Sequence, residues 1–375
     1  MHPKLSSAGP SIFSLMSQMA QSHQAINLAQ GFPNFEVDSK LKACIVEAAN
    51  GNSHQYLPYQ GLPRLREEIK SLIQRTSGLL VDTEQILVTS GATQALFTTV
   101  QALVNSGDEV VLLDPCYDCY EAPVLLVGAQ AIHVPLNGDF LPDWERIKQA
   151  VNHKTRMIII NSPHNPSGRV WEEKEYQALM DITKAYPNLL VLSDEVYEYL
   201  WYGKPHKSVR EFEGLKDKSI VVSSFGKSLQ TTGWKIGYLT APERLMNEIL
   251  QVHQFLVFSV NSVMQEAIAA YLKDFNPVNI LNDYNNRRQL FHNSLLKSRF
   301  ELLPCEGTYF QLLGFEKISD LEDTAFCEWL IKVHGVAAIP VSVFYENKPK
   351  QSVIRLCFAK DDNTLITAAE RLCKI

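Results

Sequence analysis

Short apolar, β-branched runs alternate with longer amphipathic stretches between about residue 86 and residue 240, and this alternation restricts the fold more than any other feature. The strand-like runs are ILVTS, EVVLL, RMIII, LLVLSD, SIVVSS and IGYLT. Helix-like stretches such as ATQALFTTVQALVNSG and WEEKEYQALMDITKAY lie between them. Strands that alternate with amphipathic helices are typical of a mostly parallel sheet sandwiched by helices. We therefore predict an α/β fold with a large domain of this kind.

The segments outside this region predict a second, smaller lobe. Beyond about residue 280 a polar helical stretch, NDYNNRRQLFHNSLLKSR, precedes the strand-like TYFQLLGF, a helix around TAFCEWLIKVHG and the strand-like SVIRLCF. This order indicates an α+β domain. The first thirty residues contain one helical stretch, SIFSLMSQMAQ, which can pack on either lobe. We expect an N-terminal arm or part of the small domain over 1–30, a large domain over 31–280 and a small domain over 281–375.

Composition excludes several classes of function. The 375 residues are 46% hydrophobic and 20% charged, as in globular proteins, and the net charge of -6 without a basic cluster argues against binding to nucleic acid. No apolar stretch is long enough to span a bilayer and no secretory signal is visible, so we expect a cytoplasmic protein without membrane association. Seven scattered cysteines predict reduced thiols, and the pair Cys116 and Cys119 alone is weak evidence for a redox or metal role. No cluster has metal-ligand spacing.

A lysine after the strand-like SIVVSS is the strongest candidate for chemistry. Lys227 lies in SSFGKSLQTTGWKIGY, where Gly226 and Gly233 permit tight turns and Ser224 and Lys235 can both bind one phosphate. Lysine forms Schiff bases with carbonyl cofactors, and burial lowers its pKa toward reactivity. An isolated lysine after a strand is usually a solvated surface residue, and the surrounding residues favour the functional interpretation.

Further candidate residues lie at or just after the ends of three other predicted strands. Asp194 ends LLVLSD, and it is either a helix N-cap or the carboxylate partner of a bound cationic ring. Asn165, in the turn NSPHNPSG, can donate to a ligand oxygen. In SGATQAL a strand leads into a helix start, so the backbone at Ala92 and Thr93 offers free N–H groups to an anion. Ligands of open α/β sheets bind beyond such strand ends.

These segments, in this order, resemble the class I/II aminotransferases of pyridoxal-5′-phosphate (PLP) fold type I over essentially the whole chain. The lysine segment is the most specific part of the resemblance. NLAQGFPNF, DPCYDCYE, NSPHNPSG, SDEVYE and PCEGTYF are similar to the methionine and kynurenine/glutamine aminotransferase branch. The resemblance implies the cofactor PLP, amino-acid and 2-oxo-acid substrates, a cytoplasmic transferase, and a homodimer with active sites at the subunit interface.

The resemblance also assigns roles around the cofactor ring. Lys227 would form the Schiff base and carry the proton, and Asp194 would pair with the pyridinium nitrogen. Asn165 and Tyr197 would donate to the ring oxygen, while Tyr117 would stack on the ring.

Phosphate and substrate contacts follow in the same way. Arg355, in SVIRLCF, would bind the α-carboxylate of the substrate, helped by Asn165 and the backbone at Gly31. An arginine inside an apolar strand can instead pair with a structural carboxylate. Tyr56, in HQYLPYQG, would reach the phosphate of a neighbouring subunit. The remaining phosphate contacts would come from Ser224, Lys235, Ala92 and Thr93, with Lys235 in the position where many of these enzymes carry arginine.

The function predicted is ping-pong transfer of an amino group from a thioether or aromatic amino acid to a 2-oxo acid. The segment HQFLVFSVN offers Phe255, Leu256, Val257 and Phe258 but no cation for a second carboxylate, and it is either core or part of the side-chain pocket. A β-lyase acting on cysteine conjugates uses the same residues and stays an alternative. A non-catalytic protein that senses amino acids is the alternative from another class, although no DNA-binding module is visible.

Overall fold

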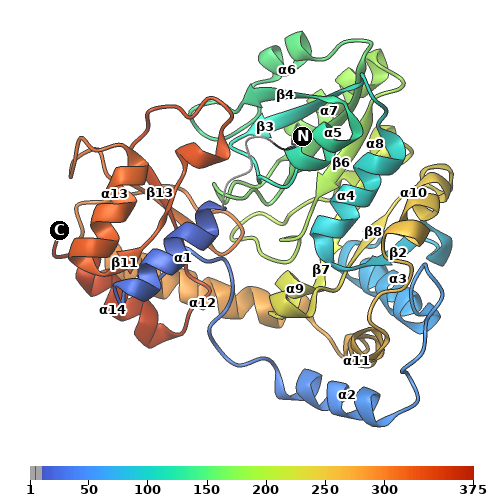
Figure 1. The fold of residues 1–375 in the computed structure, drawn as a ribbon, viewed down its shortest axis with the longest axis horizontal. Coiled ribbons are helices and arrows are strands. Elements are labelled where there is room, and N and C mark those ends of the chain that lie inside the picture. The colour runs from blue at the N-terminus through green and yellow to red at the C-terminus, as the bar shows by residue number, and fades with distance from the viewer. Residues whose placement is uncertain (1–4, 6–10) are drawn as a thin grey trace.

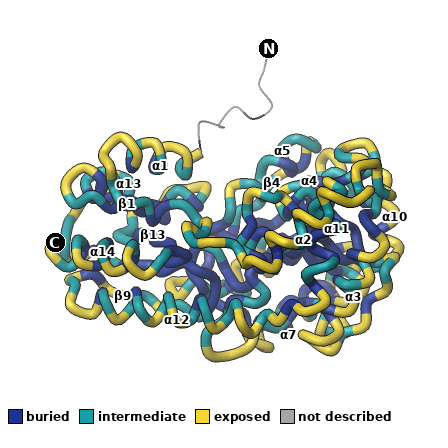
Figure 2. Tube along the Cα trace, turned by 90° about the horizontal axis from the view of Figure 1, so that it is seen from below, coloured by how far each residue is buried: buried dark blue, intermediate teal, exposed yellow. Residues whose placement is uncertain are grey.

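The computed structural model describes residue 5 and residues 11–375, which form a large and a small lobe (Figure 1). In Figure 1 the sheet with its helices, labelled α2 to α11, makes the large lobe, and the red segments with α12 and the dark-blue α1 make the small one. Dark-blue buried chain fills the interior of both lobes in Figure 2, and one hydrophobic cluster continues from the large lobe into the small one.

A seven-stranded sheet forms the centre of the large lobe. Its strands follow the order β2-β8-β7-β6-β5-β3-β4, and every strand except β8 runs in the same direction. The prediction of a mostly parallel sheet is therefore confirmed. The strands are β2 (Ile86–Thr89), β3 (Glu109–Asp114), β4 (Gln130–Pro135), β5 (Thr155–Asn161), β6 (Leu190–Asp194), β7 (Ser219–Ser224) and β8 (Gly237–Thr240).

Helices cover both faces of this sheet because its inner strands are apolar on both sides. Ile159 and Leu192 pack in one core cluster with α4 (Gly91–Leu103), α5 (Glu121–Val127) and α10 (Glu243–Leu256). Their neighbours Ile158 and Val191 pack in another with α6 (Trp144–Ala150), α7 (Glu173–Ala185) and α8 (Glu213–Lys216). A third cluster joins β2 and β8 to α3 (Pro63–Ser77) and α11 (Ser262–Leu272), and α2 (Ser39–Asn50) lies against α11. The predicted sandwich is thus confirmed.

Strand β4 does not appear among the predicted strands. It lies at the edge of the sheet and pairs in parallel with β3 alone. Only Val134 in it is buried, whereas the inner strands are buried almost throughout. An edge strand of this kind lacks the continuous apolar run that marked the other strands.

The small lobe combines a four-stranded antiparallel sheet with helices from both ends of the chain. Helix α1 (Ile12–Ser22) packs on this lobe, and β1 (Ile26–Asn27) pairs in parallel with β11 (Val336–Ala337). The N-terminal arm therefore lies on the small lobe, while the division at residues 30 and 280 stays a prediction. The sheet has the order β12 (Ile339–Pro340), β13 (Val353–Cys357), β10 (Phe310–Gly314), β9 (Glu301–Leu302), and the other helices are α12 (Pro277–Leu295), α13 (Asp323–Trp329) and α14 (Asp362–Leu372).

None of the helices over the described residues combines the length and the apolar character that crossing a membrane requires.

Candidate active site

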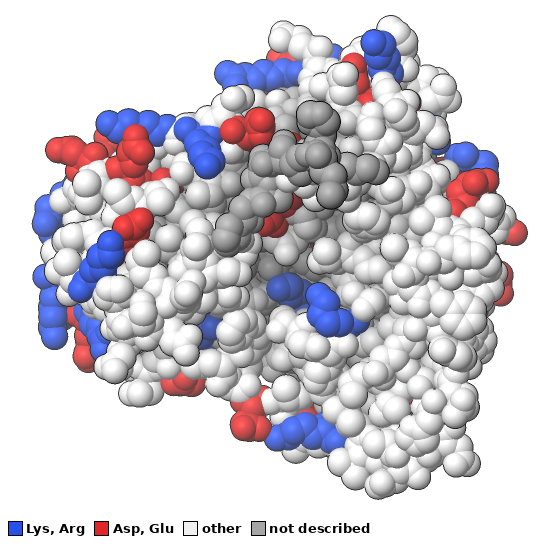
Figure 3. All heavy atoms as spheres, viewed as in Figure 1, with Lys and Arg blue, Asp and Glu red and all other residues white. Residues whose placement is uncertain are grey.

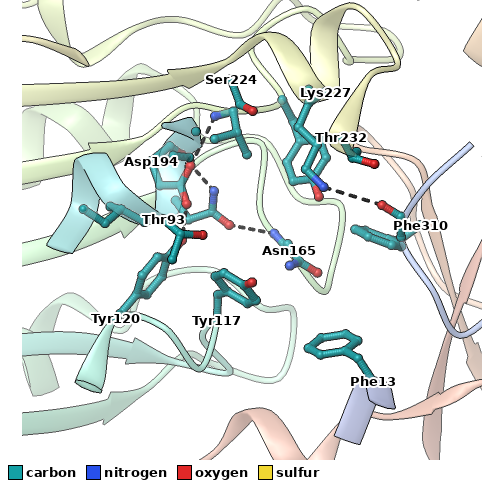
Figure 4. A pocket seen from close by; sticks show the side chains of 18 of the residues that line it. Phe13, Thr93, Tyr117, Tyr120, Asn165, Asp194, Ser224, Lys227, Thr232 and Phe310 are labelled. Carbon is teal, nitrogen blue, oxygen red and sulfur yellow. Dashed lines mark hydrogen bonds between the residues drawn. The ribbon is translucent and has the colours of Figure 1, made fainter. Parts of the chain in front are cut away.

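A cavity of about 380 Å³ opens between the two lobes, at the carboxyl ends of the parallel strands. Figure 3 shows a hollow on this side of the molecule, with basic side chains on its floor. Phe13, Phe310 and Arg355 line it from the small lobe, and the large lobe supplies the other walls (Figure 4). The cavity brings together these residues singled out from the sequence: Gly31, Ala92, Thr93, Tyr117, Asn165, Asp194, Tyr197, Ser224, Lys227, Lys235 and Arg355.

Lys227 is held in a short helix, α9 (Phe225–Ser228), that begins where β7 ends. Its Nζ donates to the Tyr309 hydroxyl at 2.8 Å and is 3.5 Å from the Gly31 carbonyl oxygen. Burial lowers the pKa of the Lys227 amine to about 8, and the nearby positive charge of Arg355 contributes in the same direction. A larger share of this amine is therefore neutral, and so nucleophilic, than of an exposed lysine.

Asp194 lies buried at the end of β6, with both carboxylate oxygens engaged. Oδ2 accepts a hydrogen bond from the Tyr120 hydroxyl at 2.6 Å, and Oδ1 accepts from the backbone N–H of Val196 at 3.2 Å. Burial raises the pKa of this carboxyl to about 6, against the effect of the Tyr120 hydrogen bond. The segment that follows is a turn, so the helix N-cap interpretation is wrong. A buried carboxylate that faces a cavity is available for a cationic ligand.

Asn165 links the two lobes across the cavity. Its backbone N–H donates to Oδ1 of Asn161 at 2.8 Å, and Asn161 in turn donates to the Asp194 carbonyl at 2.8 Å. Arg355 in β13 donates from Nη1 to Oδ1 of Asn165 at 2.6 Å. The side-chain amide nitrogen of Asn165 is then the group that can donate to a ligand.

Arg355 is 1% exposed, and no carboxylate lies within 4.0 Å of it among the residues that the structure describes. Its Nη2 donates to the Ala29 carbonyl at 3.1 Å, and its guanidinium lies 3.9 Å from the centre of the Phe310 ring. Its Nε has no hydrogen-bond partner among the described residues. The alternative of a structural ion pair is therefore wrong. A buried guanidinium without a counter-ion requires an anion from a ligand.

The first turn of α4 lines one corner of the cavity together with Ser224 and Lys235. The first N–H groups of a helix have no intrahelical acceptor, and here they belong to Gly91, Ala92 and Thr93. A Cβ placed on Gly91 would lie 3.6 Å from Nζ of Lys235, so this amine sits at the helix start. Lys235 has a φ of 55°, in the left-handed region that residues other than glycine seldom adopt.

Aromatic rings form the remaining walls, and several of them were not found from the sequence. Tyr117 stands edge-on to Tyr120 and to Phe13, with ring centres 6.0 Å and 6.4 Å apart. Tyr197 stands edge-on to Tyr309 at 5.2 Å, and burial raises the pKa of its hydroxyl. The residues of the site that sequence reasoning missed are Phe13, Tyr120, Asn161, Tyr309 and Phe310. Four of them lie in segments that carried the family resemblance: Tyr120 in DPCYDCYE, Asn161 in NSPHNPSG, and Tyr309 and Phe310 in PCEGTYF.

Gly31 and Phe310 show how closely the lobes approach at the cavity. A Cβ on Gly31 would lie 2.9 Å from Cζ of Phe310, closer than any side chain allows. The Gly31 carbonyl also accepts from the Tyr309 hydroxyl at 2.7 Å. The backbone here therefore lies directly against the aromatic wall, next to Lys227.

The sequence left the segment Phe255–Phe258 as either core or part of the side-chain pocket. The segment does not line the cavity of its own chain, so it is not part of that pocket. Phe255 is 86% exposed and Phe258 is 47% exposed, so they are not core either. Tyr56 is 82% exposed and stands edge-on to Phe258, with ring centres 5.3 Å apart. These rings form an exposed aromatic patch at the end of α10.

Cys116 and Cys119 are free thiols, as are the other five cysteines. Burial raises the pKa of both thiols well above the usual value, which disfavours the reactive thiolate. A redox role for this pair stays without support.

Comparison with known proteins identifies the family. The sequence model of the family described as aminotransferase class I and II matches residues 23–372. A methionine aminotransferase of Escherichia coli is 42% identical over 98% of this chain and 97% of its own length, and a kynurenine–oxoglutarate transaminase of Dictyostelium discoideum is 32% identical over 99% and 95%. A crystal structure of an Escherichia coli methionine aminotransferase matches with a TM-score of 0.98 and 41% identity, covering 100% of this chain and 99% of that one. The chain therefore belongs to the class I and II aminotransferases, and it is a transaminase.

Proposed function

We propose that this transaminase uses PLP and moves the amino group of methionine, or of a similar thioether or aromatic amino acid, to a 2-oxo acid by ping-pong chemistry. The observation that carries the proposal is Arg355, a buried cation without a carboxylate partner in the described part of the chain. It lies in the same cavity as Lys227, whose amine has a lowered pKa. An amino-acid carboxylate supplies the missing anion, and the amine supplies the reactive nitrogen.

The residues of the cavity fit PLP in charge and in shape. We assign its phosphate to Ser224, Lys235 and the α4 backbone at Ala92 and Thr93, where the helix start and the amine favour an anion. Tyr117 would lie against one face of the ring. When bound, PLP supplies an electron-withdrawing ring that makes the α-proton of an attached amino acid acidic.

The chain's own residues would then control the charge and the proton. The Asp194 carboxylate would hold the ring nitrogen protonated, since a charge pair about 4 Å apart at an effective dielectric of about 20 is worth about 4 kcal/mol. Asn165 and Tyr197 would donate to the ring oxygen. Nζ of Lys227 would take the proton from the α-carbon, because its lowered pKa suits it to act as a base near neutral pH.

The side-chain preference follows from the walls of the cavity. The cations that line it are Lys227, Lys235 and Arg355, and each has a role in the assignment above. None is left for a second carboxylate, whereas Phe13, Tyr117 and Phe310 offer apolar and aromatic surface. Thioether and aromatic side chains pack well on such rings. The similarity to a methionine aminotransferase supports the same preference.

Half-reaction kinetics with single amino acids test this proposal. Purified protein loaded with PLP is mixed with methionine, phenylalanine or aspartate, and the loss of cofactor absorbance is followed. We expect methionine to react at least about tenfold faster than aspartate, because an unpaired carboxylate in an apolar pocket costs more than one buried methylene gains. A clear preference for aspartate would overturn the substrate assignment but leave the family unchanged.

We further propose a homodimer that buries the aromatic patch of Tyr56, Phe255, Leu256 and Phe258. Exposed apolar residues gathered in one place mark interaction surfaces, and these four are 82%, 86%, 45% and 47% exposed. In such a dimer Tyr56 would reach the phosphate site of the neighbouring subunit. Two substitutions together, Phe255→Asp and Phe258→Asp, are expected to shift sedimentation from dimer to monomer and to weaken PLP binding. Leu80→Asp, at a site 75% exposed outside the patch, serves as the control. Unchanged sedimentation of the double variant would contradict this interface.

A further inference from the structure

A buried carboxylate at the end of β3 ties the two lobes together beside the cavity. Asp114 is 3% exposed, and its Oδ1 accepts a hydrogen bond from Nδ1 of His133 in β4 at 2.8 Å. Its Oδ2 accepts from the backbone N–H of Glu346, in the small lobe, at 3.0 Å. One side chain therefore joins two strands of the large lobe to a segment 232 residues further along the chain.

A second hydrogen bond crosses between the lobes at the same place. The backbone N–H of Cys116 donates to the carbonyl of Phe344 at 2.8 Å. Cys116 directly precedes Tyr117, which lines the cavity, and Phe344 ends the short 3-10 helix Ser342–Phe344. The two bonds fix the small-lobe segment 342–346 against the loop that carries Tyr117.

Segment 342–346 contributes Phe344 to the aromatic rings that pack around Arg355. The ring of Phe344 is 5.9 Å from the ring of Phe13, and both rings lie about equally far from the guanidinium carbon of Arg355, at 5.4 Å and 5.3 Å. Phe13 lines the cavity directly. A displacement of segment 342–346 would therefore shift the rings that pack around the proposed carboxylate site.

His133 lies among three carboxyl groups, those of Asp114, Glu121 and Glu346. Nε2 of His133 is buried, has no hydrogen-bond partner within residues 11–375, and lies 3.8 Å from Oε1 of Glu121. Burial lowers the pKa of His133, but the hydrogen bond and charge of Asp114, with the charges of Glu121 and Glu346, outweigh it and raise the pKa overall. The two oxygens of Asp114 thus accept from two donors, Nδ1 of His133 and the backbone N–H of Glu346. The fold also brings Cys116 close to Asp114 and His133, a metal-type grouping that the sequence spacing did not show and that this hydrogen bond explains.

We propose that the Asp114–His133 pair is a positioning element for the substrate, which holds segment 342–346 so that Phe344 and Phe13 keep Arg355 in its binding geometry. The inference rests on the proposed binding of an amino-acid carboxylate at Arg355. Asp114 acts through the small-lobe segment and does not itself touch the cavity.

A matched pair of substitutions at Glu346 tests the proposal without altering Asp114 or His133. Glu346→Pro removes the backbone N–H that donates to Asp114. The preceding residue, Tyr345, has φ -112° and ψ 142°, which is the extended conformation that a following proline requires. Glu346→Ala removes the exposed side chain and keeps the N–H. The protein loaded with PLP is titrated with 4-(methylthio)butanoate, the carboxylate of methionine without its amino group, by calorimetry.

We expect Glu346→Pro to raise the Kd of this analogue and the KM for methionine about tenfold, with kcat within about twofold, since one hydrogen bond to a charged group is lost. Glu346→Ala also loses the carboxylate near His133 but keeps the N–H, so its Kd and KM should stay well below those of Glu346→Pro. Equal values for the two variants would overturn the positioning role, as would a loss of thermal stability in Glu346→Pro without a change in Kd.

Asp114→Asn provides a second route, because an amide cannot accept from both donors at full strength. The expected change in Kd is again about tenfold, and Asp114→Glu should restore part of it. Asp143→Asn, which removes the charge paired with Arg146 at the N-cap of α6, outside the cavity, is the control for the loss of a carboxylate elsewhere in the large lobe. If the unchanged protein and Glu346→Ala bind the analogue but do not transaminate methionine, the proposed function fails while the positioning role can still be judged from the Kd values.

Discussion

Replacement of Lys227 by alanine is expected to abolish turnover while the fold and PLP binding survive. The amine is the group proposed to hold the cofactor covalently and to move the α-proton, whereas the phosphate corner at Ser224, Lys235 and α4 remains intact. We expect the rate of 2-oxo acid formation from methionine to fall at least about 10⁴-fold, the upper range for one acid–base group. Turnover near the original rate in this variant would reject the assignment.

Lys207→Ala is a suitable control, since this lysine pairs with Glu173 outside the cavity. Borohydride reduction of the PLP-loaded protein, followed by mass mapping, should mark Lys227 in the unchanged protein and no lysine in Lys227→Ala. The pKa of about 8 for the Lys227 amine allows an independent test. Covalent attachment of PLP requires the neutral amine, so its rate in cofactor-free protein should rise roughly tenfold per pH unit below about pH 8 and level off above it.

Replacement of Arg355 by alanine should weaken the binding of amino-acid substrates and leave the affinity for PLP nearly unchanged. The arginine is buried without a carboxylate partner among the described residues, and we propose that the substrate provides one. Breaking a buried charge pair costs about 2–5 kcal/mol, and each 1.36 kcal/mol is a factor of ten. We therefore expect kcat/KM for methionine to fall by about 30-fold to several thousandfold.

Arg355→Lys refines this test because it keeps the charge and loses the planar fork. A point charge cannot donate at once to the Asn165 amide oxygen, the Ala29 carbonyl and a carboxylate. We expect an intermediate loss of affinity for 4-(methylthio)butanoate. Arg287→Ala, which removes an arginine paired with Asp283 in α12, should leave that affinity unchanged. Loss of PLP with full substrate affinity would show that Arg355 has been assigned the wrong role.

The aromatic patch shows where an apolar run in the sequence was read wrongly. Phe255 and Phe258 look the same in the sequence whether they are core, pocket or interface, because all three environments favour large apolar side chains. The structure leaves them exposed on the outside of one chain. Only the placement of α10 on the surface decides between these possibilities.

Local pattern determined the central sheet and the residues that lie at its carboxyl edge. Apolar runs of strand length, alternating with amphipathic helices, have one stable arrangement, and it places Asp194, Asn165 and Lys227 together at the ends of neighbouring parallel strands. The pattern of apolar residues along the sequence is enough to predict this arrangement, because a strand that is buried on both faces must be apolar at successive positions.

Tertiary structure alone decided the contacts between residues far apart in the chain. The hydrogen bonds of Tyr120 to Asp194, Arg355 to Asn165 and Glu346 to Asp114 span 74, 190 and 232 residues. The pairing of β1 with β11 and the reversed direction of β8 are of the same kind. No local pattern encodes such pairs, because each depends on how two separately formed elements pack. The sequence by itself thus determined which residues carry chemistry at the edge of the sheet, and packing decided which partners tune, orient and enclose them.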